Sequence, residues 1–388
     1  MATTMVSGLV DTADPLAAEL KVDMRDKLAM LDPDTNQFQT ILGKLPSEKA
    51  NSFKKEWLQD RLVPRTTGLA ASATSATTVI SVTTSTGPYF KAGDIVRIVN
   101  TGEAVRVVSV ATDDLTVVRG LGAVTAATAQ STADGGLVIV GGSNEQGATL
   151  PTALGTQRVA AYNYTQIVRN SWRFTRTATE TGFYAGSLLG KERKKKGTEH
   201  NTDKENMFFF GARSYSAGTN NPRHTCGGLI EFISTNVTSA STLDKGTFND
   251  FMRTGLQAGS SNKVLFAAPI VAQVISEFLA DNWVRATPGD SVWGAKVDAY
   301  ISAIYGTSVP VIVKRQWGAY GALAANFYST KAFLVDMESV AEAPMHTSEL
   351  LRNRQANDAD EVAEEYLYEG SLIVAQETHH SLLDDVIG

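Results

Sequence analysis

The chain has 388 residues, 43% of them hydrophobic and 20% charged, which is the composition of a folded, soluble protein with two or three compact units. Cys226 stands alone, so an intramolecular disulfide and a Cys-rich zinc site are excluded. The net charge is -6 and the pI is near 5.5, whereas domains that seek out free nucleic acid usually have a pI above about 9. Any contact with nucleic acid is therefore expected to be local.

The sequence shows neither a secretory signal peptide nor a membrane-spanning segment. The first twenty residues lack the basic start and apolar core of a signal peptide. The longest apolar stretch, 264–272, contains Pro269 and is about half as long as a bilayer helix requires. We expect synthesis in a cytoplasm and no membrane contact.

Residues 1–45 mix a short amphipathic piece with turn residues, which predicts an extended arm with a helix near 22–31. Residues 66–150 are rich in Ala, Thr, Ser, Val and Gly. Short alternating runs predict a compact antiparallel sheet or small barrel with strands at 78–83, 94–99, 104–110, 115–118 and 137–140. The flanking sequence has a different, polar and aromatic character, so we interpret this unit as an insertion.

Residues 165–177 alternate strictly, with Val168, Trp172 and Phe174 on one face of a predicted strand and Arg169 and Arg173 on the other. A long helix is predicted over 180–212. Its four glycines each cost roughly 1 kcal/mol relative to Ala, so we expect tertiary packing to support it and a kink or break near Gly197.

The remainder predicts mixed α/β structure. We expect helices at 247–258 and 270–282, the first capped by Asp244 or Thr247 and the second opened by Pro269. Strands are expected at 264–268, 297–304, 309–314, 332–336 and 361 to about 378.

The search for catalytic motifs is negative: the sequence holds no nucleophile elbow, phosphate loop or H-E-x-x-H zinc motif. His379-His380 near Asp384 could hold a metal, but adjacent strand side chains point to opposite faces, so no metal, cofactor or catalytic residue is predicted. His224 and Cys226 permit a thiol hydrolase hypothesis, although a semi-buried cysteine in a turn explains the same residues.

A basic band and an acidic segment are the strongest charge features. Between 151 and 196 there are nine Lys or Arg and two acids, a local balance of +7. We expect this band either to pair with the acidic residues of 358–369 on a neighbouring subunit or to face phosphates without sequence readout. A merely solvated helix face is the alternative. The carboxylates concerned are Asp358, Asp360, Glu361, Glu364 and Glu365.

Nearly the whole chain resembles major capsid proteins of tailed bacteriophages with the Hong Kong 97-type fold, in the group with a β-domain inserted in the E-loop. The resemblance rests on the order and spacing of several segments, none diagnostic alone: Leu31-Asp-Pro-Asp34, Glu56-Trp57, Ala92-Gly-Asp94, Val118-Arg-Gly120, Asn163-Tyr-Thr-Gln-Ile167, Glu205-Asn-Met-Phe-Phe-Phe-Gly211, Thr225-Cys-Gly-Gly-Leu229 and Glu365-Tyr-Leu-Tyr368.

The resemblance implies an α+β fold with an N-terminal arm, an E-loop, a P-domain with a long spine helix, and an A-domain. The expected divisions are arm 1–45, E-loop region 46–178 with the insertion 66–150, spine-helix region 179–224, A-domain 225–330 and returning P-domain strands 331–388. The insertion is expected either to dock a cement protein or to brace neighbours. Shell size and covalent crosslinking cannot be inferred from the residues.

The implied function is structural and non-enzymatic. Copies would form hexamers and pentamers of an icosahedral shell around double-stranded DNA in the virion, made in the bacterial cytoplasm. Expected partners are other copies, a separate scaffolding protein, a portal, a possible cement protein and the DNA. Trp57, Arg169, Trp172 and Arg173 are the expected subunit contacts besides the five carboxylates, and Lys194, Lys195 and Lys196 the expected DNA-facing residues. The alternative is an encapsulin-like shell around a protein cargo.

Overall fold

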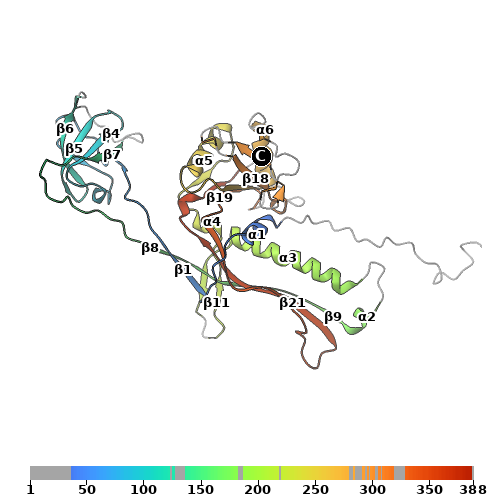
Figure 1. The fold of residues 1–388 in the computed structure, drawn as a ribbon. Helices are drawn as coiled ribbons and strands as arrows, with labels where there is room; N and C mark the ends of the chain where they lie inside the picture. Colours follow the sequence, from blue (N-terminus) through green and yellow to red (C-terminus); the bar gives the residue numbers. More distant parts are fainter. Residues whose placement is uncertain are drawn as a thin grey trace, which may run out of the picture. The chain divides into compact units, whose positions relative to one another are not determined.

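The computed structural model describes residues 36–122, 125–126, 136–181, 187–217, 220–278, 283–284, 291–292, 295–296, 298–301, 305–306, 308–318 and 328–386. The chain divides into two compact units (Figure 1), one formed by Met1–Trp57 with Ala161–Gly388 and the other by Leu58–Ala160. The helix expected near 22–31 lies outside the described residues.

The unit Leu58–Ala160 is a six-stranded antiparallel barrel. Its strand order is β2-β7-β4-β5-β6-β3, and a bridge between Leu69 and Val82 joins the two ends of that order. Alternate apolar side chains such as Val96 and Val107 point inward and are at most 1% exposed, because strand residues alternate between two faces. The strands are β2 (Thr66–Gly68), β3 (Val79–Ser81), β4 (Asp94–Ile98), β5 (Ala104–Ala111), β6 (Asp114–Leu121) and β7 (Gly136–Gly142).

All five strands expected in this segment are present, and β2 is an additional one. Outside the barrel, β1 (Lys54–Gln59) pairs with β8 (Val159–Tyr164) in a two-stranded sheet.

The larger unit contains a seven-stranded mixed sheet of order β12-β22-β19-β13-β18-β17-β14. Its central strand β13 (Lys263–Ala267) is buried along its whole length, as expected for a continuous apolar run with strands on both sides. The other strands are β12 (Val237–Ser239), β14 (Trp283–Val284), β17 (Asp298–Ile301), β18 (Ser308–Val313), β19 (Ala332–Asp336) and β22 (Ser381–Asp384). A separate two-stranded sheet joins β15 (Ser291–Val292) and β16 (Ala295–Lys296).

Helices α5 (Lys245–Gln257) and α6 (Pro269–Phe278) confirm the two helices expected next to this sheet. The N-cap of α5 is Asp244, whose side chain accepts a hydrogen bond from Thr247 N at 2.6 Å. The predicted last four residues of the second helix, 279–282, lie outside the described residues.

A second, three-stranded sheet has the order β20-β21-β9. β9 (Gln166–Thr175) pairs in continuous antiparallel register with β21 (Glu361–Val374), and β20 (Val340–Leu351) pairs with the other edge of β21. The expected strand to 378 was too long, because Gln376 has left-handed backbone with φ 55° and the chain turns there into the short helix η4 (Glu377–His379).

The long helix α3 (Leu188–Phe210) runs along this sheet (Figure 1). The start predicted at 180 was wrong, because a separate short helix α2 (Arg176–Glu180) ends there and Ser187 caps α3. The break predicted near Gly197 was also wrong, since α3 continues through it. A Cβ at Gly197 would lie 3.3 Å from the Tyr366 hydroxyl, so the glycine lets that ring pack closely against the helix.

Short elements connect these parts. Helix α1 (Gln37–Leu42) follows the N-terminal residues, β10 (Ser214–Ser216) and β11 (Arg223–Thr225) form a hairpin, and α4 (Leu229–Phe232) follows it. At the centre of the core, the Phe209 ring at the end of α3 lies 4.6 Å from Phe38, 5.4 Å from Phe266 and 4.8 Å from Trp317, measured between ring centroids. These aromatic contacts join α1, α3 and the seven-stranded sheet.

Candidate assembly surfaces

The basic band and the acidic segment meet within one chain. Arg169 on β9 bonds to Glu365 on β21, with Nε to Oε2 at 2.9 Å, and Arg354 reaches the other carboxylate oxygen of Glu365 at 2.9 Å. Arg193 on α3 forms a two-bond pair with Glu364 at 2.7 and 2.5 Å. Alternation along β21 places Glu364 toward the helix and Glu365 on the opposite face.

Both carboxylates are almost completely buried, with side-chain exposures of 3% for Glu364 and 4% for Glu365. Burial by itself raises the pKa of Glu365, but the hydrogen bonds and charge of Arg169 and Arg354 outweigh burial and hold that pKa below its usual value. These two carboxylates therefore have partners in their own chain.

Trp172 is also committed to intrachain packing. Its side chain is 6% exposed, and its ring lies 5.5 Å from that of Tyr366 on the neighbouring strand. On the same helix-facing side, His200 Nδ1 bonds to Asn170 Oδ1 at 2.7 Å, and burial lowers the His200 pKa to about 4. This face of β9 holds α3 in place.

Other predicted site residues are more exposed. Arg173 and Glu361 form an ion pair at 3.5 Å in which the Arg173 side chain is 72% exposed. Asp360 pairs with Arg176 at 3.3 Å, again at the surface. Asp358 is exposed in the connection between β20 and β21. Trp57 is half-buried, with its ring 5.9 Å from Phe232.

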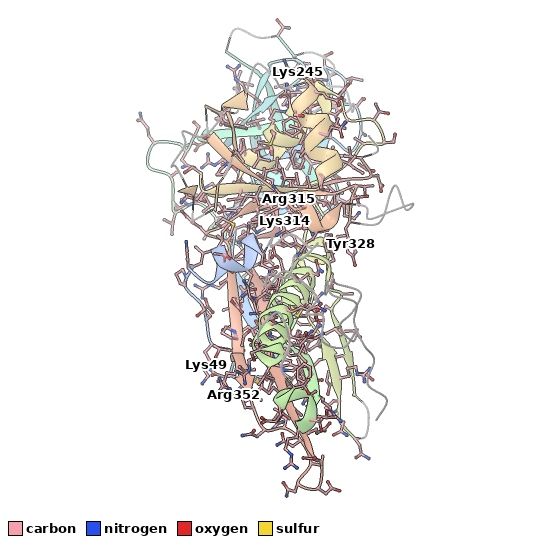
Figure 2. All side chains as sticks on the ribbon, turned by 90° about the vertical axis from the view of Figure 1, so that its right-hand side faces the viewer. Lys49, Lys245, Lys314, Arg315, Tyr328 and Arg352 are labelled. Atoms are coloured by element: carbon pink, nitrogen blue, oxygen red, sulfur yellow. The ribbon has the colours of Figure 1, made fainter. Side chains whose placement is uncertain are left out.

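A buried ion pair links α1, α3 and the end of β18. Lys314 Nζ contacts Glu205 Oε1, and the side-chain exposures are 0% and 1%. Phe38 N donates to the same carboxylate oxygen at 3.1 Å, and Lys314 also donates to Gln37 Oε1 at 3.0 Å. Figure 2 shows Lys314 beside α1 and the end of α3. The pair therefore fixes α1 to both the helix and the sheet.

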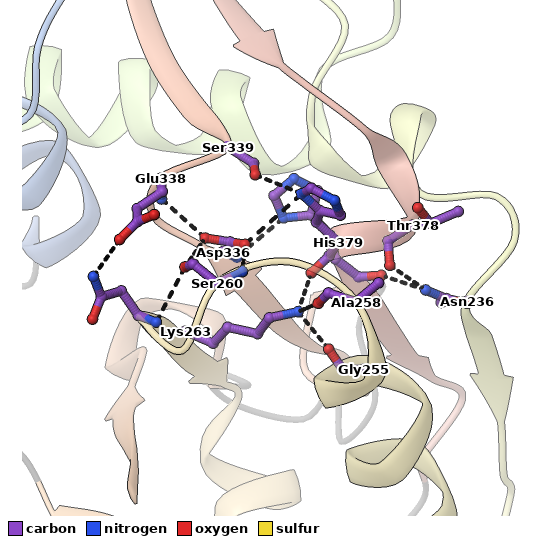
Figure 3. Close-up of polar contacts among 12 residues, drawn as sticks. Asn236, Gly255, Ala258, Ser260, Lys263, Asp336, Glu338, Ser339, Thr378 and His379 are labelled. Carbon is purple, nitrogen blue, oxygen red and sulfur yellow. Dashed lines mark hydrogen bonds and ion pairs between the residues drawn. The ribbon is translucent and has the colours of Figure 1, made fainter. Parts of the chain in front are cut away.

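A second polar network anchors the segment that follows β21 (Figure 3). The buried Lys263 Nζ donates to the carbonyl oxygens of Gly255 at 2.6 Å, Ala258 at 2.5 Å and His379 at 2.6 Å. Burial lowers the pKa of Lys263 to about 8. The ammonium group thus satisfies carbonyls at the end of α5 and joins them to η4.

Asp336, next to this ammonium, is fully buried and accepts hydrogen bonds from Ser260 N and Oγ, both at 2.7 Å. Burial raises its pKa, but these bonds and that from Glu338 N outweigh it, so the pKa lies below the usual value. His380 is also fully buried, and burial lowers its pKa to about 3. These groups are engaged in holding the backbone.

A family model described as the SU10 major capsid protein matches residues 3–386, which is nearly the whole chain. The chain belongs to the SU10 major capsid protein family. It is a phage major capsid protein, and a protein of this kind is part of the virion. This confirms the structural role expected from the sequence.

A curated major capsid protein of Pseudomonas phage PaMx41 is 32% identical to this capsid protein over 166 residues. That match covers 42% of this chain and 39% of the phage protein, so the chain matches less than half the length of this curated relative. A solved structure from Gordonia phage Cozz is similar over 100% of both chains, with 10% identity and a TM-score of 0.50. A structure from Mycobacterium phage Adephagia covers 98% of each chain at 10% identity, with a TM-score of 0.48. The fold is the expected α+β fold of Hong Kong 97 type.

In the capsid protein, Cys226 is fully buried, and burial raises its pKa to about 11. Asn163 Nδ2 lies 3.3 Å from its sulfur, while His224 Nδ1 donates to the Thr165 carbonyl oxygen. The thiol is therefore protonated at neutral pH and is not an activated nucleophile. This geometry gives the hydrolase hypothesis no support.

The described residues were compared with the requirements of a metal site and of a membrane-spanning helix. No three His, Cys, Asp or Glu side chains among them are grouped so as to hold a metal ion. No helix within the described ranges is both long and apolar enough to cross a membrane.

Sequence reasoning missed Lys263 and Lys314, two of the lysines that are buried among the described residues. Lys263 begins the apolar run of β13, and Lys314 directly follows β18. A lysine at the end of an apolar strand was the available signal. Gly255 and Ala258 are near Lys263 in sequence, but the partners that tie each lysine to another part of the fold are distant, 109 residues away for Glu205 and 116 for His379.

Proposed function

We propose that copies of this chain form hexamers and pentamers that close into an icosahedral shell around double-stranded DNA. The observation that carries this proposal is the family match over residues 3–386. Closed shells form when identical surfaces recur on every copy, so that many weak contacts add up to a stable assembly.

Exposed apolar side chains near the barrel support a role that requires neighbours. Leu62 is 92% exposed, Leu150 95% and Val159 65%. Contact with other copies would remove such side chains from water. We assign 46–178 as the E-loop region, 1–45 as the arm, 179–224 with 331–388 as the P-domain and 225–330 as the A-domain, and expect arm and E-loop to move during maturation.

The exposure of each side chain decides which of the predicted contact residues remain candidates for contacts between subunits. Arg173, Asp358 and Asp360 retain exposed side chains and Trp57 is half-buried, so these residues are the better candidates. Arg169 and Glu361 are partly engaged within the chain, and Trp172, Glu364 and Glu365 are buried by it. A neighbour would therefore meet chiefly the exposed residues of this set.

Lys194 and Lys195 are the proposed DNA-facing residues, with Lys196 a weaker one. The first two are exposed on α3, although Lys195 lies 4.0 Å from Glu199, whereas Lys196 is less exposed and bonds to Glu199 at 2.6 Å. Replacing Lys194 and Lys195 by Glu should leave particles that hold less DNA, because phosphate contacts are electrostatic and sequence-independent. The control is Lys245→Glu, an exposed reversal at the start of α5. Equal DNA content in particles of the wild type, of the double variant and of Lys245→Glu would contradict this role.

The experiment for the whole proposal expresses this chain alone and together with a candidate scaffolding protein. Sedimentation then shows whether closed particles form, and nuclease treatment shows whether they protect DNA. We expect closed particles that, when isolated from phage, protect double-stranded DNA. A portal at one vertex, a cement protein and synthesis in the bacterial cytoplasm complete the proposal. Phage particles that hold protein cargo in place of protected DNA would contradict it and favour the encapsulin-like alternative.

A further inference from the structure

The outer face of the barrel strands β7, β4, β5 and β6 (Figure 1) carries two neighbouring arginines. Arg97 lies on β4 and Arg106 on β5. The residues on either side of each are at most 1% exposed, so both guanidinium groups point away from the core. Ile95 is paired with Arg106, and Arg97 with Ala104. The two arginines are therefore diagonal neighbours on one face, about 7–8 Å apart.

This pair of cations has no counter-charge on its own strands. Neither Arg97 nor Arg106 forms an ion pair or a side-chain hydrogen bond with a described residue, whereas Arg119 on β6 pairs with Glu103 at 2.6 Å. The one carboxylate on β4, β5 and β7 is that of Asp94, which is 4% exposed and accepts a backbone hydrogen bond at 3.0 Å. Like charges side by side repel each other, so this face favours an anionic partner.

Apolar side chains surround the two arginines. Arg106 is paired with Val118 on β6, and Arg97 with Val138 on β7. Val118 is 40% exposed, and Val140 on β7 is 57% exposed. Arginine among exposed apolar residues, with acidic residues depleted, is the composition of the central part of a protein interface. A partner that covers this face must supply carboxylates, because an unpaired buried guanidinium is costly.

The exposed carboxylates of this chain are poorly suited to meet these arginines from a second copy. Several of them already pair with cations of the same copy: Glu48 with Lys55 at 3.0 Å, Glu56 with Lys54 at 2.5 Å, Asp250 with Arg253 at 2.9 Å and Asp360 with Arg176 at 3.3 Å. The exposed Glu349 and Asp358 flank Arg352 and Arg354 in the sequence, so their segment would also bring positive charge. A separate protein with unpaired carboxylates is electrostatically the better match.

We propose that the outer face around Arg97 and Arg106 binds an acidic, apolar segment of a separate protein that accompanies the shell. Each guanidinium takes one carboxylate in a two-bond pair, and Val118, Val138 and Val140 contact apolar side chains placed between those carboxylates. The inference rests on the proposed function, since it names the surface that a cement protein would use. It gives the inserted barrel the first of the two roles expected from the sequence.

Site-specific photocrosslinking in intact particles tests this surface. The variant Arg97→p-benzoylphenylalanine places a photoreactive ring on the face. The control is Val79→p-benzoylphenylalanine, at a position 43% exposed on β3, which two strands separate from β4 in the sheet order. Particles are isolated from infected cells and irradiated, and the linked peptides are identified by mass spectrometry.

We expect a separate protein to be linked at least tenfold more from position 97 than from position 79, through a segment of negative net charge. Linkage to a second copy of this chain, linkage to a segment without carboxylates, or no linkage would overturn the docking and leave the proposed function standing. Wild-type protein that forms no particles with or without scaffold would overturn both.

Charge reversal gives a second readout. Arg97→Glu combined with Arg106→Glu should still form particles but hold at least tenfold less of the linked protein. Arg61→Glu, at another exposed arginine of the same unit, is the control and should retain it. Double-variant particles that keep the protein at the wild-type level would overturn the docking. If the double variant forms no particles, the crosslinking result decides alone.

Discussion

Replacing Lys314 by Met should strongly destabilise the larger unit. The substitution removes the cation from a pair in which both side chains are at most 1% exposed and leaves Glu205 buried. Its Oε1 would retain only the bond from Phe38 N at 3.1 Å, and its Oε2 has no partner among the described residues. Removing one member of a buried ion pair costs about 3–5 kcal/mol, so we expect this loss in the free energy of unfolding.

The paired replacement is the matched control. Lys314→Met combined with Glu205→Leu removes both charges and leaves an apolar site, so the loss should fall to about 1–2 kcal/mol, mainly from the unsatisfied Phe38 N–H. Urea unfolding followed by tryptophan fluorescence measures the effect in the larger unit, because residues 58–160 contain no tryptophan.

The direction in which the stability of Lys314→Met changes with pH also follows from the structure. Burial already raises the pKa of Glu205, whose charged form Lys314 favours. Without the lysine, the folded state holds a proton that the unfolded state releases, so Lys314→Met should lose stability as the pH rises from 5 to 8. A single-variant cost below about 1 kcal/mol, or a double variant as unstable as the sum of the two singles, would refute the reasoning.

The remaining predictions concern pH, a turn and a helix cap. His200 and His380 have folded-state pKa values lowered by burial to about 4 and about 3. Between pH 6.5 and 5 each should therefore lower the stability by about 1 kcal/mol per pH unit as the pH falls, and a flat urea midpoint over this range would contradict this. Gly259→Ala should cost about 1–3 kcal/mol, because φ is +86° and a Cβ would lie 2.4 Å from Asp336 Oδ2; Gly190→Ala in α3 is the control and should be neutral or stabilising. Asp244→Ala should cost about 1 kcal/mol through the lost N-cap of α5, and an unchanged melting temperature would exclude that role.

Local patterns predicted much of the fold. Alternation located β9, and the run from Ala332 to Asp336 matched β19 at both ends. The N-cap at Asp244 and the proline at the start of α6 were readable because capping depends on neighbouring residues. Such features involve a few consecutive residues and therefore leave a direct signal.

Long-range pairing could not be predicted in the same way. The opposite charges of the two segments were evident, but the sequence did not indicate that Arg169 and Glu365 meet within one chain, because they are 196 residues apart. The glycine at 197 was equally ambiguous. A helical glycine marks either a break or a close approach, and only the position of Tyr366 decides between them.

Cryo-electron microscopy of the protein expressed with its scaffolding protein tests the central claim most directly. The account predicts closed icosahedral shells in which hexamers and pentamers repeat this chain. A protein that stays monomeric or dimeric with and without scaffold would contradict it.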